Sequence, residues 1–303
     1  MVETFPYEIL TCGQLAERAF ACGSKGLVRA VFERSFYIKM RHEDHVCVGI
    51  PEIGHGPLNV IIRPHFSLQT VRPWPNLDDT AELNLGLLWL QKKPFARWVF
   101  PHIAAPPIPV LWSAESLQAG LAELMRLASK SAPEESLFAL CRDGTALRSL
   151  SPSQQHAVAA TLHIGDVVAQ RGQLKFRADI ISSLLGLGPG LTPSGDDLLM
   201  GTLIALRFLQ LDSILEDLWS IVAVTMNDRT HSISRSHLRA AARGHCAPPL
   251  EATLRCLAEG DGVNLGVAIQ GAAKLGHTSG WDFLTGIVIV LRGFDARLHA
   301  VLP

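Results

Sequence analysis

The residues best suited to chemistry lie in one glycine-rich stretch, GLGPGLTPSGDDLLMG, which runs from Gly186 to Gly201. It places two adjacent carboxylates, Asp196 and Asp197, just before the apolar run 202–211. A buried helix that starts there points unpaired backbone N–H groups and its positive dipole end toward the loop. Glycines let a ligand approach bare backbone, as happens where chains bind phosphate, carboxylate or carbamoyl oxygens. The stretch therefore predicts a small-anion site at a helix start.

The expected ligand contacts in this stretch are the loop glycines and the hydroxyls beside the helix start. They are Gly188, Gly190, Thr192, Ser194 and Gly195. Thr192, followed by proline, and Ser194 are both suitable N-cap residues. The two carboxylates would repel an anion unless a cation such as Mg²⁺ or an N–H group of the ligand intervenes, or unless one of them only caps the helix. The alternative is a glycine-rich turn whose acidic residues simply suit the helix dipole.

The same motif recurs near the end of the chain. HTSGWDFLTGIVIVL, residues 277–291, aligns without gaps on TPSGDDLLMGTLIAL, residues 192–206. In both, SGxDxLxG precedes an apolar helix; the matched residues are Ser194 and Ser279, Gly195 and Gly280, and Asp197 and Asp282. A duplicated helix start suggests two N-termini that face one ligand, although Ser-Gly-x-Asp can also recur as a capping pattern. We expect catalytic roles for Asp197 and Asp282, which recur, ahead of Asp196.

A third polar cluster lies between the two motifs, in NDRTHSISRSHLRAAARGH, residues 227–245. Guanidinium groups bind carboxylate or phosphate with two hydrogen bonds, and hydroxyls add further contacts. We expect Arg229, Thr230 and Ser232 to bind the anion, ahead of His231 and His237. The alternative is an exposed polar loop that caps the next helix.

Composition limits the classes of function. The chain has 303 residues, of which 48% are hydrophobic and 18% charged, with a formal net charge of −1. This length favours two domains, and the absence of a long basic run argues against a nucleic-acid partner. No leader or long apolar stretch is visible, so we expect a cytoplasmic protein without membrane contact. Six cysteines without a CxxC pair indicate reduced thiols rather than disulfides or a zinc site, and no metal-binding residues are predicted.

The pattern of residue types changes along the chain, from strand-like in the first part to helix-like in the second. LVRAVFERSFYIKM, HVCVGI, PLNVIIRP and FSLQTVRP are β-rich runs bounded by turn residues, typical of antiparallel strands in a small barrel or sandwich. Residues 113–129 and 151–170 have helical spacing behind Ser caps, and the proline-rich PHIAAPPIPV separates the two parts. We predict an α+β fold, with a β-rich domain at 1–112 and a helical domain at 113–303 that carries the glycine-rich loop.

Two features of the β-rich part also attract attention. His55 lies between two glycines, so it is either a solvated loop residue or a ligand contact. Asp78, Asp79 and Thr80 precede an apolar run, and we interpret them as a helix cap rather than a metal site.

At these motifs the sequence resembles the AllH-like family, formerly an uncharacterised bacterial domain family, a subunit of the oxamate carbamoyltransferase of anaerobic allantoin breakdown. The resemblance spans most of the chain and is strongest from about 180 to 290; it rests on GLGPGLTPSGDDLLMG, on the Thr-x-Ser-x-Ser stretch at 230–234 and on the terminal SGxDxLxG. It implies carbamoyl transfer between oxamate, or a related ureido compound, and phosphate to give carbamoyl phosphate. It also implies further transferase subunits, a small anionic ligand and no firm cofactor, with Mg²⁺ as the one to test.

Within that resemblance, backbone N–H groups at a helix start would stabilise the oxyanion, and Asp197 or Asp282 would accept hydrogen bonds or act as a base. Two other classes fit the same residues. One is a metal-dependent hydrolase or phosphotransferase that uses the three aspartates around Mg²⁺. The other is a noncatalytic subunit that binds a small carboxylate.

Overall fold

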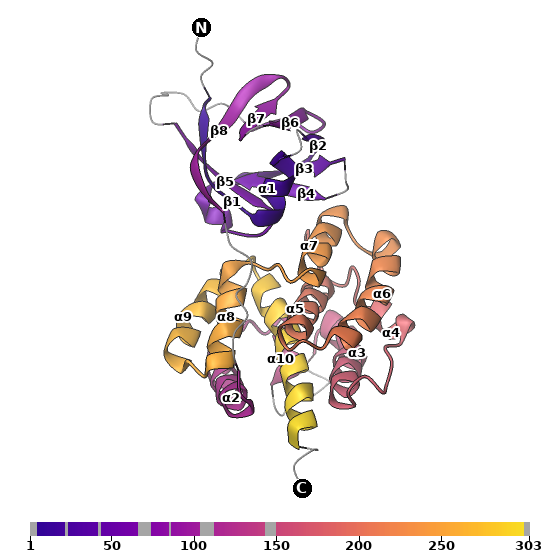
Figure 1. The fold of residues 1–303 in the computed structure, drawn as a ribbon. Helices are drawn as coiled ribbons and strands as arrows, with labels where there is room; N and C mark the ends of the chain where they lie inside the picture. Colours follow the sequence, from indigo (N-terminus) through magenta and orange to yellow (C-terminus); the bar gives the residue numbers. More distant parts are fainter. Residues whose placement is uncertain are drawn as a thin grey trace. The chain divides into compact units, whose positions relative to one another are not determined.

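The computed structural model describes residues 5–21, 24–41, 44–65, 74–84, 86–103, 112–142 and 150–299. The chain divides into two compact units, Met1–Pro106 and Pro107–Pro303, hereafter unit 1 and unit 2. Unit 1 is built mainly from strands and unit 2 from helices (Figure 1). The predicted α+β class, with a β barrel followed by a helical part, is confirmed. Most of the proline-rich stretch that we took as the boundary lies at 104–111, outside the described residues.

Unit 1 is a closed eight-stranded barrel with the order β1-β5-β4-β3-β2-β6-β7-β8. Its strands are β1 (Tyr7–Cys12), β2 (Ser24–Val31), β3 (Ser35–Met40), β4 (His45–Gly49), β5 (Asn59–Pro64), β6 (Thr80–Asn84), β7 (Leu87–Leu90) and β8 (Lys93–Ile103), with a helix α1 (Gln14–Ala21) and a 3₁₀ turn η1 (Pro51–Ile53). Neighbouring strands are antiparallel except β1 with β8 and β4 with β5. The predicted strand FSLQTVRP, residues 66–73, lies outside the described residues.

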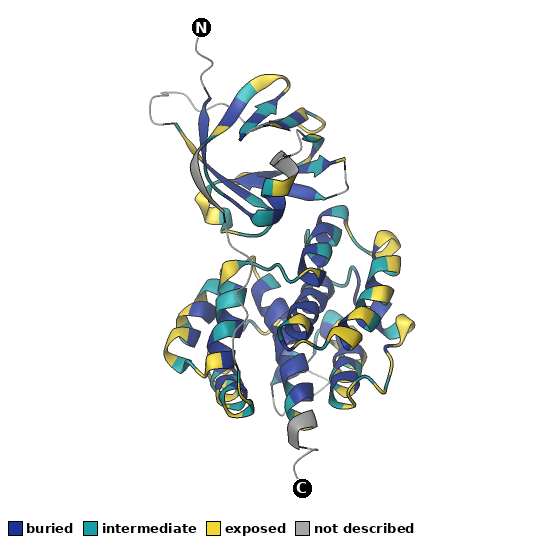
Figure 2. Ribbon diagram, in the orientation of Figure 1, coloured by how far each residue is buried: buried dark blue, intermediate teal, exposed yellow. Residues whose placement is uncertain are grey.

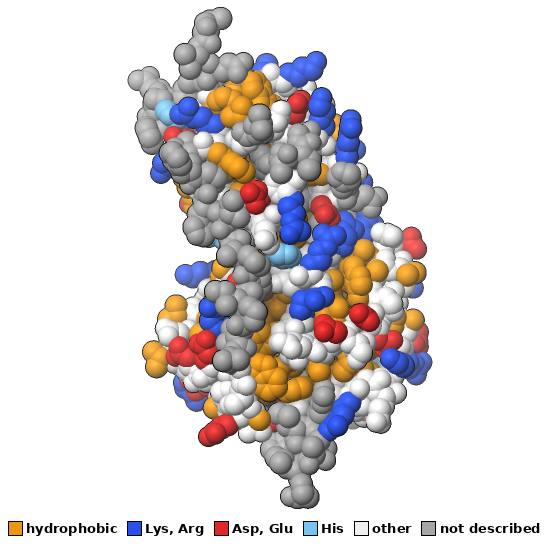
Figure 3. Space-filling view, in the orientation of Figure 1, with side chains coloured by type: hydrophobic (Ala, Val, Ile, Leu, Met, Phe, Trp, Pro, Cys, Tyr) orange, Lys and Arg blue, Asp and Glu red, His pale blue; other side chains and the backbone are white. Residues whose placement is uncertain are grey.

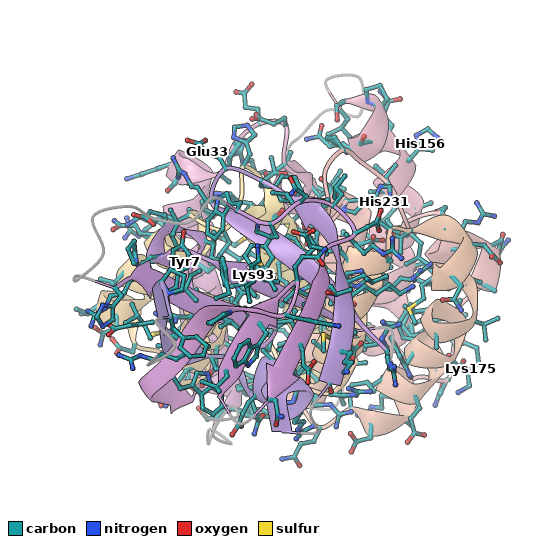
Figure 4. All side chains as sticks on the ribbon, turned by 90° about the horizontal axis from the view of Figure 1, so that it is seen from above. Tyr7, Glu33, Lys93, His156, Lys175 and His231 are labelled. Carbon is teal, nitrogen blue, oxygen red and sulfur yellow. The ribbon has the colours of Figure 1, made fainter. Side chains whose placement is uncertain are left out.

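The barrel interior is filled by one face of each strand. In β6, Ala81 and Leu83 are buried in the barrel core, whereas the residues that alternate with them face outward. Aromatic rings fill much of the space: Tyr7 lies 4.7 Å from Phe95 and 6.0 Å from Trp74, measured between ring centroids. Figure 4 labels Tyr7 among the side chains of the strands. This interior leaves the outer faces of the strands free to carry polar residues.

The predicted helix cap at Asp78 and Asp79 is wrong, because a strand follows it. β6 begins at Thr80. The Asp79 carboxylate accepts hydrogen bonds from the Asn76 backbone N–H and from the Gln91 side-chain amide, and so closes a turn. The Asp carboxylate accepts hydrogen bonds from backbone N–H groups both in helix caps and in such turns. A short apolar run that follows it is compatible with a helix or with a strand, so the sequence did not distinguish the two.

Unit 2 is a helical assembly. Its elements are α2 (Ala114–Ser131), η2 (Leu137–Cys141), α3 (Pro152–Ala169), α4 (Ala178–Ser182), α5 (Ser194–Phe208), α6 (Asp212–Arg229), α7 (Ser232–Ala242), α8 (Pro248–Glu259), α9 (Gly262–Ala272) and α10 (Ser279–His299). Ser113 and Ser151 form the capping boxes that start α2 and α3. Among the described residues, no helix combines the length and the apolar composition that spanning a bilayer requires.

Helices α5 and α10 form the centre of unit 2. Every residue from Gly195 to Leu206 of α5 is buried, as is every residue of α10 from 280 to 288. Figure 2 shows both helices dark blue along these stretches, and Figure 1 shows them side by side. Because the apolar residues of α5 surround the whole helix, it packs against neighbours on every side.

Reciprocal glycine contacts bring the two helices together. A Cβ atom at Gly201 would lie 1.9 Å from the carbonyl oxygen of Phe283, and one at Gly286 would lie 2.1 Å from that of Leu198. Gly201 aligns with Gly286 in the repeated motif, and Leu198 aligns with Phe283. The same contact is therefore made twice, once in each direction. Only glycine allows the two backbones to approach so closely.

Candidate functional site

The two SGxD motifs meet at the N-terminal ends of α5 and α10. The hydroxyl oxygens of Thr192 and Ser279, one from each copy, lie 3.5 Å apart. The charge of Asp282 is close enough to Asp197 to raise its pKa. The two copies, 85 positions apart in sequence, thus form a single cluster, as expected if the two helix starts face one site.

The serine of each copy interacts with the aspartate of the other. The Ser279 hydroxyl donates a hydrogen bond to the Asp197 carboxyl, and the Ser194 hydroxyl donates one to the Asp282 carboxyl. Asp282 Oδ1 also accepts a hydrogen bond of 2.7 Å from the backbone N–H of Leu137, at the start of η2. The exchange between copies fixes where each serine points.

Burial dominates the electrostatics of this pair. Asp197 is 5% exposed and Asp282 is fully buried. Desolvation raises the pKa of Asp197 well above its usual value and also raises the pKa of Asp282, and the serine hydrogen bonds only partly oppose these shifts. Among the described residues, Oδ2 of each aspartate is buried without a hydrogen-bond partner. A carboxyl with a raised pKa keeps its proton to higher pH, and a protonated carboxyl can donate a hydrogen bond.

Asp196 has a different environment. Its Oδ1 accepts a hydrogen bond of 2.9 Å from the backbone N–H of Gly186, and its Oδ2 accepts hydrogen bonds from the hydroxyls of Thr230 and Ser234. Burial nevertheless raises its pKa. This fully buried carboxylate therefore ties the glycine-rich loop to the start of α7. The second copy has Trp281 at the matching position.

Sequence reasoning missed Ser234, although a signal was present. Ser234 is fully buried and its hydroxyl lies 2.6 Å from Asp196 Oδ2. Thr230 is the C-cap residue of α6 and Ser234 lies in the first turn of α7, so the short link between the two helices brings both hydroxyls to one acceptor. The predicted anion-binding residues included Ser232, the second hydroxyl of the Thr-x-Ser-x-Ser stretch, and left out Ser234, the third.

The helix start differs from both predicted caps. Helix α5 begins at Ser194 with Pro193 as the N-cap residue, and no side chain caps it. Among the described residues, the structure gives no hydrogen-bond acceptor for the backbone N–H of Ser194 or of Ser279. Each motif therefore offers the backbone N–H of one serine at its helix start, beside the hydroxyl that bonds to the aspartate of the other copy.

A left-handed glycine lies over each of these serines. Gly188 has φ 106°, and a Cβ atom there would lie 3.1 Å from both N and Oγ of Ser194. Gly276 has φ 67°, and its Cβ would lie 3.1 Å from Ser279 Oγ. In both copies the absence of a side chain keeps the serine N–H and hydroxyl approachable.

The other predicted glycines fall into two groups. Gly190 has φ 100° and is exposed, and a Cβ there would have as its nearest neighbour the carbonyl oxygen of Thr192, at 3.9 Å. Gly195 and Gly280 are buried, and a Cβ on either would lie within about 2 Å of a backbone carbonyl oxygen, at 2.1 Å from Leu184 and 1.9 Å from Ala272. These two glycines allow each helix start to pack against the backbone that precedes it, and their role in ligand binding stays a prediction.

The predicted anion-binding residues of the third cluster divide in the same way. Arg229 is exposed, and among the described residues its side chain has no ion pair or hydrogen bond. The Thr230 hydroxyl is committed to Asp196. Ser232 is half-buried and already makes an interaction within the protein. Arg229 therefore has the most available side chain of the three.

Neither histidine of the third cluster is placed as a ligand contact. His231, labelled in Figure 4, is the exposed N-cap residue of α7, and its charge lowers the pKa of Asp196. Burial lowers the pKa of His237 to about 4, so this side chain is neutral at physiological pH. His55 belongs to unit 1, where its Nδ1 lies 2.9 Å from the Thr11 hydroxyl. In the part of the chain that the structure describes, no three His, Cys, Asp or Glu residues are grouped to hold a metal ion.

Comparison with known proteins bears on the stretch that holds this cluster. No solved structure matches the chain. One protein family matches residues 184–291, which include the glycine-rich loop, the third polar cluster and the second SGxD motif. The resemblance stated from the sequence is confirmed over these residues. The family that they match is oxamate carbamoyltransferase subunit AllH.

Proposed function

We propose that this chain is a subunit of a carbamoyltransferase and that it binds the carbamoyl compound at the paired SGxD helix starts. The observation that carries the proposal is that the region matched by the AllH family contains both motifs, and that these meet as one cluster. In the proposed reaction a carbamoyl group passes between the nitrogen of oxamate, or of a related ureido compound, and an oxygen of phosphate. When phosphate accepts the carbamoyl group, the products are carbamoyl phosphate and the amide, such as oxamate, that carried the group.

The two helix starts suit a ligand with two carbonyl ends. Each start offers the backbone N–H of one serine, Ser194 or Ser279, next to a glycine, while the serine hydroxyl itself donates to the aspartate of the other copy. Thr192 adds a hydroxyl between them. Backbone N–H groups at a helix start favour partial negative charge on an oxygen, through the hydrogen bond and through the helix dipole. One carbonyl oxygen would bind at each start.

Arg229 distinguishes the two ends. The backbone carbonyl oxygen of Arg229 would be 2.2 Å from a Cβ at Gly186, so the arginine backbone lies against the glycine-rich loop of the first copy. An exposed guanidinium on that side would bind the carboxylate of the substrate or the phosphate with paired hydrogen bonds. The neutral carbamoyl end would then bind at the start of α10.

The transfer step requires stabilisation of an oxyanion. Phosphate oxygen attacks the carbamoyl carbon, the carbonyl oxygen gains negative charge, and the carbon–nitrogen bond breaks as the leaving nitrogen takes a proton. N–H groups fixed before the reaction stabilise that charge without reorganisation, and losing one such donor typically costs about 10²–10³-fold in rate. In this proposal Asp197 and Asp282 act through the serines, since they are buried and each orients the serine of the other copy. Asp196 holds the loop.

Substitution of the glycine above Ser194 tests the binding mode. Gly188→Ala would place a methyl group 3.1 Å from the serine N and Oγ, whereas Gly190→Ala carries a similar φ of 100° without a methyl near that serine. We expect Gly188→Ala to abolish transfer by the reconstituted multi-subunit enzyme, and Gly190→Ala to retain it apart from a small loss of stability. Equal activity of the two variants would contradict the proposal, as would equal inactivity of two folded variants.

A noncatalytic binding subunit is the second candidate, and the burial of Asp196, Asp197 and Asp282 favours it, because none of these three carboxylates is exposed to act as a base. Calorimetric titration of the purified chain with oxamate, phosphate and carbamoyl phosphate, with and without Mg²⁺, addresses this. Binding of oxamate that is weakened by Arg229→Ala but gives no turnover without partner subunits favours this alternative. Mg²⁺-dependent turnover by the chain alone would instead favour the alternative of a metal-dependent hydrolase or phosphotransferase.

A further inference from the structure

A second candidate site lies on the outer face of the barrel, far in sequence from the SGxD motifs. Strands β3, β2, β6 and β7 are consecutive neighbours, and their outward residues are joined by register: Lys39 with Leu27, Lys25 with Glu82, and Glu82 with Trp89. With adjacent strands about 4.8 Å apart, this face is about 14 Å wide. It presents a continuous row of side chains that the barrel core does not use.

One end of this face is strongly basic. A hollow of about 560 Å³ is lined by five cationic side chains, namely Lys25, Arg29, Lys39, Arg41 and Lys92, and by one carboxylate, Glu82. The chain as a whole has a net charge of −1, so this concentration of positive charge is local. Figure 3 shows Lys and Arg side chains gathered on the side of unit 1 where Figure 1 labels β2 and β6.

Only part of that positive charge is compensated. Lys25 lies 3.5 Å from Glu82, and Arg29 pairs with Asp78; both pairs are exposed. Lys39, Arg41 and Lys92 have no carboxylate partner in the part of the chain that the structure describes. Uncompensated cations around one concave surface attract an anion with several charges.

The backbone holds Lys92 in an unfavourable conformation. Gln91 and Lys92 form the turn between β7 and β8 with φ 49° and 60°, where glycine or asparagine is usual. The Gln91 side chain anchors this turn by a 2.7 Å hydrogen bond to Asp79. A left-handed residue that is not glycine costs energy, and such positions concentrate at functional sites. The turn holds the lysine at the rim of the hollow.

The other end of the face is aromatic. A second hollow of about 330 Å³ shares Glu82 and Lys92 with the first and is also lined by Asn84, Leu87 and Trp89. The Trp89 ring is half-buried and is held edge-to-face by Phe5, with 5.5 Å between ring centroids. A fixed, partly exposed indole beside a leucine offers a surface on which a planar base can stack, and an adjacent amide can hydrogen-bond the edge of the base.

We propose that this outer face of the barrel binds a nucleotide that carries two or three phosphates. The phosphates occupy the basic hollow, next to Lys39, Arg41 and Lys92, and the base lies against Trp89. Glu82, between the two hollows, is placed to accept hydrogen bonds from the ribose hydroxyls. The combined hollows are in the size range of small-molecule sites. This site shares no residue with the SGxD cluster and does not depend on the function proposed for that cluster.

Calorimetry on the full chain tests the assignment with ATP, inorganic triphosphate and adenosine as ligands. We expect ATP to bind more tightly than triphosphate, and adenosine to bind weakly. The Lys39→Gln/Lys92→Gln double variant should weaken ATP and triphosphate about tenfold or more, corresponding to the loss of two charge-assisted contacts. Trp89→Leu should weaken ATP alone. Lys274→Gln, at an exposed lysine of unit 2, is the matched control and should change neither.

Three results would overturn the proposal. The first is that neither ATP nor triphosphate binds to the folded chain. The second is that both bind, but Lys39→Gln/Lys92→Gln has no more effect than Lys274→Gln. The third is that polyglutamate binds at this face while ATP does not, which would identify it as a docking surface for an acidic protein. Far-ultraviolet circular dichroism of each variant establishes that loss of binding is not loss of folding.

Discussion

At the scale of single residues, the three aspartates of the repeated motif do different things despite their similar sequence context. Asp197 and Asp282 face each other's serines, whereas Asp196 accepts three hydrogen bonds that hold the glycine-rich loop against the start of α7. The two copies differ at one position of the SGxD motif, where the first has Asp196 and the second has Trp281. At this position the two halves of the cluster differ in chemistry.

Asp196→Ala should destabilise unit 2 by about 2–3 kcal/mol, because it leaves the buried hydroxyl of Ser234 and the partly buried N–H of Gly186 and hydroxyl of Thr230 without their acceptor. Asp179→Ala is the control, since that aspartate is exposed and its ion pair with Arg177 lies at the surface; it should cost far less than Asp196→Ala. Urea unfolding followed by circular dichroism measures both. Similar costs for the two substitutions would show that the hydrogen bonds to Asp196 contribute little.

Asp197→Asn tests the electrostatics of the buried pair. Because burial raises the pKa of Asp197 in the folded chain, the native state holds this proton more tightly than the unfolded state. The stability associated with the protonated carboxyl is present below the unfolded pKa and is lost as the pH rises through the folded pKa. Asn does not titrate, so the variant should gain stability relative to the wild type as the pH rises above the unfolded pKa of about 4.

Unfolding midpoints in urea across this pH range give the difference between the two proteins directly. Asp179→Asn serves as the control, because the pKa of Asp179 is lowered by its hydrogen bond with Arg177 and the trend should have the opposite sign. A difference between Asp197→Asn and wild type that does not change with pH would contradict the assignment of a raised pKa to Asp197.

At the scale of elements, the pairing of α5 with α10 controls the geometry of the cluster. The two serine-bearing helix starts are brought together because Gly201 and Gly286 let the helix backbones touch. Each helix carries its own SGxD motif, so the distance between the motifs is set by this contact and not by the loops.

Gly201→Ala should destabilise unit 2 by about 3 kcal/mol, since its Cβ would overlap the Phe283 carbonyl oxygen and push the helices apart. Gly165→Ala in α3 is a matched helical control: its Cβ would have nothing nearer than 3.9 Å, so the higher helix propensity of alanine should stabilise by about 0.5 kcal/mol. Thermal unfolding compares them. If both substitutions stabilised the protein, close helix contact at Gly201 would be excluded.

Some of the helices could be predicted from the sequence, and the contacts between them could not. Helical periodicity and the serine caps ahead of it placed α2 and α3 correctly, because capping is local chemistry. The α5 start was misread, since a proline N-cap without a side-chain acceptor has no such signature. The meeting of Ser279 with Asp197 was visible only as a repeated motif, because pairing between distant helices leaves no periodic trace. The roles proposed for these residues in catalysis stay predictions.

At the scale of the whole chain, each unit has a hydrophobic core of its own. The barrel core and the helical core share no residue. Fragments Met1–Pro106 and Pro107–Pro303 should therefore each fold alone, and the second should retain oxamate binding if the SGxD cluster is the binding site. Calorimetry of the fragments would show cooperative unfolding of each. A fragment Pro107–Pro303 without a cooperative transition would mean that unit 2 depends on unit 1.

The reciprocal glycine contact has the form of a symmetric dimer interface contained in one chain, since Gly201 meets the residue that matches the one Gly286 meets. In an isologous interface residue i of one half contacts residue j of the other, and j of the first half contacts i of the second. A substitution at one position therefore changes the packing of its counterpart. The two helices therefore constrain each other's variation: substitutions along α5 and α10 should combine non-additively even when each lies far from any ligand. The two helices form one structural unit, and the positions where their motifs differ, such as Asp196 and Trp281, are where its internal symmetry is broken.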